Sequence, residues 1–122
     1  MNHLFVIAIA GAIGAVSRYG LVNLVGGKTF PWGTLVVNVL GSCLMGMFYV
    51  LIVERNVLPA SMRPFFMTGF LGAFTTFSAF SLETWELFDR GEPIQAMVYI
   101  AGSVLLCIVA LVVGVLLTRL SL

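Results

Sequence analysis

Charged residues are scarce in this sequence. Lys, Arg, Asp and Glu make up 9% of 122 residues and hydrophobic residues make up 61%, whereas about a quarter of a soluble domain is charged. Four long stretches between the charged residues are apolar. They are residues 4–27 (interrupted only by Arg18), 29–53, 64–82 and 93–118. This pattern excludes a soluble globular protein and predicts an all-α membrane protein with four transmembrane helices.

Other features are missing as well. No Lys or Arg precedes the first apolar stretch, so we expect no cleaved signal peptide. Cys43 and Cys107 fall inside apolar stretches, where a thiol is a small apolar side chain, and we assign them no redox role. The spans leave no room for a soluble domain. We therefore expect residues 1–122 to form a single transmembrane domain, with helices at about 4–25, 33–53, 64–88 and 94–118.

The third apolar stretch carries the signs of an interrupted helix. Gly69 and Gly72 weaken a helix interior, and the hydroxyls of Thr75, Thr76 and Ser78 can cap a new helix or satisfy freed backbone groups. Non-helical backbone at membrane depth is tolerated only where protein or a wet cavity covers it. We therefore predict a discontinuous membrane helix, interrupted near Gly72 to Thr75, that lines a pathway.

Two rows of residues at four-residue spacing run along the other helices. They are Thr34, Asn38 and Ser42 in the second helix, and Tyr99, Ser103 and Cys107 in the fourth. Each row shares one helical face. An amide in hydrocarbon needs partners, so hydrogen bonding between helices explains the rows. A path for a small anion also requires such donors, and we favour this interpretation for the first row.

Arg18 is the one charge inside the first apolar stretch, where an arginine costs a few kcal/mol. It either anchors the helix at the membrane interface beside Tyr19 or attracts anions. Small residues along this helix predict a ridge for close approach of another helix. They are Ala8, Gly11, Ala12 and Ala15.

The third stretch is rich in phenylalanine and ends in acidic residues. Helical spacing relates Phe66, Phe70, Phe74 and Phe77. That spacing equally fits a lipid-facing stripe, so periodicity does not select the rings that matter. We expect Glu83, Glu86 and Asp89 at a solvated helix end.

The basic residues are evenly divided between the two sides of a four-span protein. One side has Arg55, Arg63 and Arg119, and the other has Lys28, Arg90 and, if it reaches the interface, Arg18. Such a balance gives no preferred orientation, and four thin helices do not enclose a pathway alone. An antiparallel, dual-topology homodimer whose two copies cross at the broken third helices satisfies both observations.

Three motifs then follow one another along the chain. They are GAIGAVSRY at 11–19, GTLVVN at 33–38 with Gly41 and Ser42 after it, and GFLGAFTTFSAFS at 69–81. With these motifs in this order, the chain resembles the Fluc/CrcB family of fluoride channels over its whole length. The resemblance implies a channel and not an enzyme. It would export fluoride from the bacterial cytoplasm across the inner membrane by passive electrodiffusion, with two pores per antiparallel dimer, and protect against fluoride toxicity.

The resemblance also implies roles for particular residues. Phe77 and Phe80 match the pore phenylalanines, Asn38 matches the pore asparagine, and Arg18 matches the vestibule arginine. The expected fluoride pathway is completed by Thr76, Ser78, Tyr99 and Ser103. The carbonyls of Gly72 and Thr75, from both subunits, match those that hold a structural sodium ion. The chain departs from the family pattern at Cys107, where a serine is expected, and at Ala79, where threonine is frequent.

A small dual-topology four-helix drug exporter is the alternative function. It needs a membrane-embedded carboxylate, and we expect none at the buried positions in the first three-quarters of the chain. A purely structural assembly subunit explains the small residues but leaves the polar rows without a purpose. We therefore expect a channel whose partners are a second copy of the chain, fluoride and the lipid bilayer, with no nucleic acid.

Overall fold

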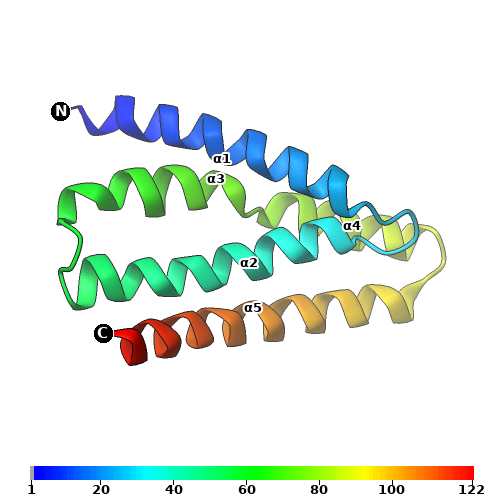
Figure 1. The fold of residues 1–122 in the computed structure, drawn as a ribbon. Helices are drawn as coiled ribbons and strands as arrows, with labels where there is room; N and C mark the ends of the chain where they lie inside the picture. The colour runs from blue at the N-terminus through cyan, green and yellow to red at the C-terminus, as the bar shows by residue number, and fades with distance from the viewer. Residues whose placement is uncertain (1) are drawn as a thin grey trace.

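The computed structural model describes residues 2–122, which form four helical rods (Figure 1). All four rods are long and apolar enough to cross a membrane. The elements in chain order are α1 (His3–Val25), α2 (Trp32–Phe48), the π-helical η1 (Tyr49–Glu54), the 3-10 turn η2 (Ala60–Met62), the π-helical η3 (Pro64–Leu71), α3 (Gly72–Phe74), α4 (Phe77–Asp89) and α5 (Pro93–Ser121). The second rod is α2 with η1, and the third runs from η2 to α4.

The rods lie side by side with both termini at the same end (Figure 1). α2 packs along α5, and α1 packs against η3 and α3. At the end that holds the termini, Arg119 donates from Nε to Glu54 Oε1 at 2.8 Å, which ties α5 to η1. The third rod contacts each of the other three rods, so its position depends on all of them.

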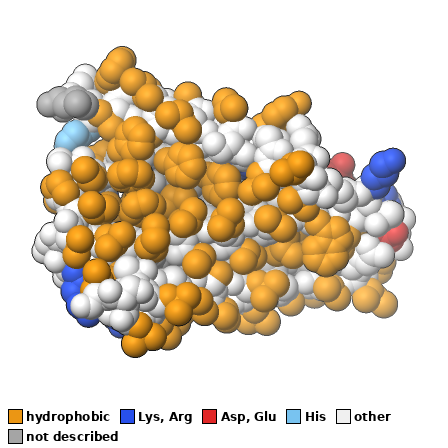
Figure 2. Space-filling view, viewed as in Figure 1, with side chains coloured by type: hydrophobic (Ala, Val, Ile, Leu, Met, Phe, Trp, Pro, Cys, Tyr) orange, Lys and Arg blue, Asp and Glu red, His pale blue; other side chains and the backbone are white. Residues whose placement is uncertain are grey.

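The outer surface of the bundle is apolar. Figure 2 shows hydrophobic side chains along the whole visible face and charged side chains gathered toward the two ends. On α5, for example, Val98 and Leu105 are exposed. Side chains of this kind are stable against hydrocarbon and unfavourable against water. The four rods and this surface are those of a multi-pass membrane protein.

Two clusters of buried side chains hold the rods together. The first has Val37, Leu71 and Phe74 at its centre, and the second has Leu87, Ala96 and Tyr99. The first cluster joins α2 to η3 and α3, and the second joins α4 to α5. Each half of the third rod is therefore packed separately, one on either side of its interruption.

Two phenylalanines of the predicted stripe face the protein. Phe66 stacks on Phe48 with 4.6 Å between ring centroids, and Phe74 is buried in the first cluster. The lipid-facing interpretation is therefore wrong for these two rings. Phe77 differs, because 76% of its surface is exposed in the single chain.

The tightest contact of α1 lies beside the predicted ridge and shares its Gly11. Ala10 and Gly14 are buried, whereas Ala8 and Ala12 are exposed. A Cβ atom added at Gly14 would lie 2.2 Å from the carbonyl oxygen of Phe70. Gly11 of the predicted ridge also approaches η3, since a Cβ atom added there would lie 3.8 Å from the carbonyl oxygen of Gly69.

We expect Gly14→Ala to destabilise the protein by about 1–3 kcal/mol, because the new methyl group would press on backbone that cannot rotate away. The measurement is the Tm of the purified protein in detergent. Gly20→Ala is the matched control on the same helix, since nothing lies within 4 Å of a Cβ at Gly20. Equal Tm values for the two variants would contradict the close contact.

Candidate functional site

Two residues interrupt the third rod. Thr75 and Thr76 are extended between α3 and α4, with φ/ψ of −91°/156° and −150°/125°. The Thr75 hydroxyl donates to Leu71 O at 2.9 Å, and the Thr76 hydroxyl accepts the N–H of Ala79 at 3.2 Å. The first bond closes the end of α3 and the second caps the start of α4.

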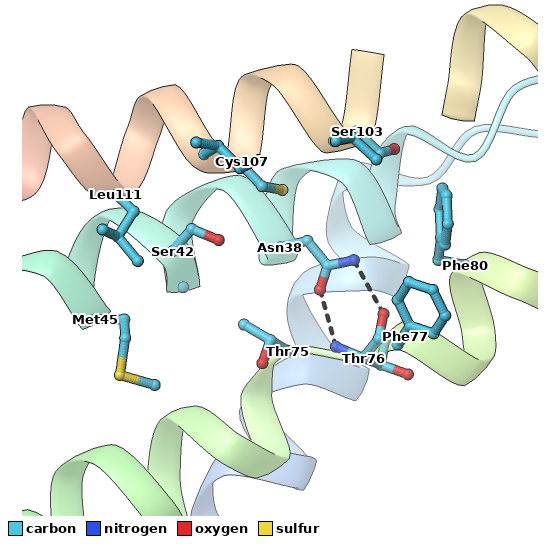
Figure 3. Close-up of a pocket in the computed structure, with 13 residues that line it drawn as sticks. Asn38, Ser42, Met45, Thr75, Thr76, Phe77, Phe80, Ser103, Cys107 and Leu111 are labelled. Atoms are coloured by element: carbon cyan, nitrogen blue, oxygen red, sulfur yellow. Dashed lines mark hydrogen bonds between the residues drawn. The ribbon is translucent and has the colours of Figure 1, made fainter. Parts of the chain in front are cut away.

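Asn38 on α2 supplies the hydrogen bonds that the helix gives up at the interruption. Its Oδ1 accepts the N–H of Thr76 at 2.8 Å, and its Nδ2 donates to Thr76 O at 3.0 Å (Figure 3). One side-chain amide thus satisfies both backbone groups of one residue. Gly41, further along α2, has no Cβ because that atom would lie 2.2 Å from the Thr75 methyl group. α2 is therefore fitted to the interruption by both contact and hydrogen bonding.

This hydrogen bonding also takes the helical N–H donors away from two backbone carbonyls, those of Gly72 and Thr75. In a continuous helix, Gly72 O would accept from Thr76 N–H, and Thr75 O from Ala79 N–H. Here those N–H groups bond to Asn38 Oδ1 and to the Thr76 hydroxyl. The carbonyls of Gly72 and Thr75 lose their helical donors, and backbone carbonyl oxygens are suitable ligands for a small alkali cation. The residues present fit a carbonyl site for sodium.

Arg18 contacts the interruption from the other side. Its Nε donates to Ala73 O at 3.1 Å, which replaces another bond lost at the end of α3. A cation is favourable at the C-terminal end of a helix, where carbonyl oxygens carry partial negative charge. Neither sequence interpretation of Arg18 included this contact. Its neighbour Tyr19 is exposed, as a membrane-interface side chain would be.

A cavity of about 400 Å³ lies beside the interruption, open on one side. Figure 3 shows α2, α5 and the Thr75–Thr76 segment around it. Its polar lining is Asn38, Ser42, Thr75, Thr76, Ser103 and Cys107, and its aromatic lining is Phe77 and Phe80. The later members of both polar rows therefore face one space, and its lining side chains are all neutral.

Ser103 is the unusual member of this lining. Its surface is only 6% exposed, and within residues 2–122 its hydroxyl is the buried side-chain polar atom without a hydrogen-bond partner. A buried hydroxyl that stays unpaired costs about 1–3 kcal/mol. The hydroxyl oxygen itself is enclosed and does not reach the open part of the cavity.

The first members of the two rows meet at a carboxylate. Thr34 Oγ1 donates to Glu83 Oε2 at 2.8 Å, and the Tyr99 hydroxyl donates to Glu83 Oε1 at 2.9 Å. Glu83 is half-buried, whereas Glu86 is exposed. Glu83 also lines a second, open pocket with Lys28, Glu86 and Arg90, so water reaches this end of α4 as expected, and the two hydrogen bonds are an addition to that expectation. The spacing of three residues between Phe80 and Glu83, which places both on one face of α4, was the signal available in the sequence.

The comparisons with known proteins agree with one another. A family model described as CrcB-like protein, Camphor Resistance (CrcB), matches residues 5–115. The chain belongs to the CrcB family. A fluoride-specific ion channel of Hahella chejuensis is 50% identical over 98% of this chain and 97% of its own length. Another, of Magnetococcus marinus, is 48% identical over 93% and 95%, and one of Nitrobacter winogradskyi is 46% identical over 98% of both chains.

In this CrcB-family chain, the predicted site residues fall into separate groups. Around the cavity lie Asn38, Thr76, Phe77, Phe80 and Ser103. Tyr99 is buried beside Glu83, with 5.0 Å between its ring centroid and that of Phe80. Ser78 is exposed, and its hydroxyl lies 3.3 Å from that of Thr76. Phe80 therefore links the cavity to the Glu83 cluster, while Arg18 lies at the Ala73 end of the interruption.

We expect Asn38→Leu to loosen the interruption in the CrcB-family chain. Leucine is also branched at Cγ but makes neither hydrogen bond to Thr76, so leaving the backbone groups of Thr76 unpaired costs about 1–3 kcal/mol. Hydrogen exchange at the Thr76 amide should accelerate by about tenfold or more. Asn23→Leu, at an exposed position of α1, is the matched control. Unchanged exchange in Asn38→Leu would show that the amide does not hold this segment.

Proposed function

We propose that this chain is a fluoride channel of the bacterial inner membrane, which exports fluoride by passive electrodiffusion and so protects the cell from fluoride toxicity. The observation that carries the proposal is the cavity at the interruption, whose lining combines neutral hydrogen-bond donors with the rings of Phe77 and Phe80. Fluoride is a small, strong hydrogen-bond acceptor, so such donors suit it. The printed names of the relatives, fluoride-specific ion channels, support the choice of ion.

The lining suits an anion that must also leave. Ser42 and Thr76, both half-buried in the cavity lining, offer hydroxyls that replace part of the hydration shell of fluoride. The rings of Phe77 and Phe80, 5.4 Å apart between centroids, have electropositive edges that attract an anion weakly. Conduction requires sites that bind well enough to admit the ion and weakly enough to release it. Neutral donors and ring edges satisfy that requirement better than a fixed positive charge would.

A second copy of the chain completes the pathway in this proposal. The cavity is open on one side, and the ring of Phe77 stands largely exposed beside it. An antiparallel partner that crosses at the interrupted third rod would cover Phe77 and close the cavity of each copy, which gives two pores. The even division of basic residues between the two sides of the bundle supports the two opposite orientations.

A sodium ion at the centre of that dimer belongs to the same proposal. The carbonyls of Gly72 and Thr75, which lose their helical donors, would hold it from both copies. The bound cation would supply positive charge where carbonyl dipoles converge. Arg18, bonded to Ala73 O, stabilises the neighbouring carbonyl in each copy.

The Glu83 carboxylate bears on the alternative function, a drug exporter. Glu83 is a half-buried carboxylate near the end of a span, whereas the buried polar residues among residues 2–122 are Thr34 and Ser103. Both oxygens of Glu83 accept hydrogen bonds from Thr34 and Tyr99, and Glu83 is not part of the cavity lining. A cation-binding exporter needs its carboxylate in the substrate cavity, so the channel remains the better explanation.

We expect purified protein in liposomes to release fluoride, followed with a fluoride electrode, and to release little chloride. Phe77→Ile and Phe80→Ile should each lower fluoride efflux by about tenfold or more, because isoleucine keeps bulk but lacks the electropositive ring edge. Phe5→Ile, at an exposed ring on α1, should keep normal efflux. Phe66 is unsuitable as a control because it stacks on Phe48. Normal fluoride efflux in both pore variants would show that the ion passes elsewhere.

A tag at the C-terminus should be found on both sides of the membrane within one population of cells. Accessibility of the tag to a membrane-impermeant label, before and after permeabilisation, measures the two fractions. Lysines added to the loop at residues 26–31 should shift the population to one orientation, because loop charge sets topology. A single orientation in the unmodified chain would rule out the antiparallel dimer.

A further inference from the structure

The charged side chains are divided unequally between the two ends of the bundle (Figures 1 and 2). The end that holds the termini has three basic side chains and one acidic one, which are Arg55, Arg63, Arg119 and Glu54. The opposite end has two basic side chains and four acidic ones, which are Lys28, Arg90, Glu83, Glu86, Asp89 and Glu92. The bundle is therefore positive at one end and negative at the other.

The third rod has the same polarity by itself. Arg63 directly precedes η3 and stands twelve residues before Thr75, while Asp89 ends α4, thirteen residues after Thr76. At about 1.5 Å per residue, each charge lies roughly 18–20 Å from the interruption. That distance is slightly more than half of the ~30 Å hydrocarbon core. The interruption is thus at the middle of the rod, with Arg63 at one membrane surface and Asp89 at the other.

Arg63 and Asp89 are not engaged within their own chain. Both are exposed, and neither forms an ion pair within residues 2–122. The other arginines at the two ends are paired, Arg55 and Arg119 with Glu54 and Arg90 with Glu92. Glu86 lines a small pocket together with Lys28 and Arg90. Arg63 and Asp89 are therefore the charges of the third rod that are free to meet another molecule.

Asp89 also belongs to the exposed stripe of α4 that begins at the interruption. Phe77, Ser81, Trp85 and Asp89 follow one another at four-residue spacing, and all four are exposed. Residues four apart on a helix are neighbours on one face. In the proposed function a second copy covers Phe77. Asp89 then stands at the outer end of the same contact surface.

We propose that Arg63 of one copy and Asp89 of the other attract each other, and that this attraction favours antiparallel pairing. The proposal rests on the antiparallel dimer of the proposed function. Two rods that cross at their interruptions in opposite directions bring the positive start of one to the membrane surface that holds the negative end of the other. This happens once at each surface. In a parallel pair, like charges would meet at both surfaces, which is unfavourable.

This attraction supplies a selection that insertion does not make. The balance of basic residues leaves both orientations of the chain populated, so a copy meets partners of either orientation. Acidic residues contribute little to orientation during insertion. Asp89 can therefore mark one end of the rod for pairing without fixing how the chain inserts.

The test co-expresses two full-length variants with different tags, Arg63→Glu and Asp89→Lys. Each variant paired with itself places like charges together at both surfaces, whereas the mixed pair has opposite charges at both. Purification through the two tags in turn measures the mixed dimers. Their ratio to either homodimer should be about tenfold higher than for the control pair, since four charge contacts change from repulsive to attractive or the reverse.

The control pair is Arg55→Glu with Glu92→Lys. These substitutions make the same charge changes at the same two ends, so they change orientation during insertion equally, but they lie off the third rod. The double variant Arg63→Glu/Asp89→Lys restores opposite charges within a homodimer and should dimerise like the wild type. It also keeps the test decisive if a single variant does not accumulate.

The outcomes separate this proposal from the proposed function. Mixed dimers at the same ratio in the test and control pairs, or a double variant that fails to dimerise while the wild type does, would overturn the attraction between Arg63 and Asp89. A wild-type chain that forms no dimer would overturn the antiparallel dimer as well. Preferential mixed pairing with no fluoride efflux from wild-type liposomes would overturn the channel and leave the charge pairing supported.

Discussion

The pair of hydrogen bonds between the Asn38 amide and the backbone of Thr76 is the contact on which the rest of the site depends. A helix interrupted among apolar side chains would leave buried N–H and C=O groups unpaired, each at a cost of about 1–3 kcal/mol. Asn38 removes that cost for both the N–H and the C=O of Thr76. It also fixes α2 against the interruption, and α2 in turn carries Ser42 and Met45 to the cavity. This amide therefore joins the interruption to the wall of the cavity, in addition to the packing of both halves of the third rod.

The charges near the site are kept outside the cavity. Arg18 bonds to the carbonyl of Ala73, at the end of α3, while Glu83 bonds to Thr34 and Tyr99 beyond Phe80. A buried charge is tolerated when it is hydrogen-bonded, and both charges have such partners. The cavity between them is lined by neutral donors and rings. This separation suits an ion that must be attracted to the site but must not be held by a fixed charge inside the cavity.

Composition and run length were sufficient to predict four membrane-spanning helices, because a charge inside a span is costly and its absence is visible in the sequence. The face that each helix turns inward was harder to predict. In α1 and the third rod nearly every residue is apolar or small, so Ala10 and Gly14 do not stand out from Ala8 and Ala12. The burial of Phe74 likewise depends on partners from α2 and η3, which periodicity does not reveal. The hydrogen bonds of Glu83 were not predicted, because their donors Thr34 and Tyr99 lie far from it in the chain.

The two polar rows differ along their length in whether their hydroxyls are hydrogen-bonded. The hydroxyls of Thr34 and Tyr99 both donate hydrogen bonds to Glu83, so the hydroxyls at that end of the two rows are paired and held in place. One turn further along α5, Ser103 has no such partner within residues 2–122. Proteins depart from complete hydrogen bonding mainly where function requires it. The next residue of that face, Cys107, lines the open cavity. A thiol at that position therefore shares the accessibility of the pathway.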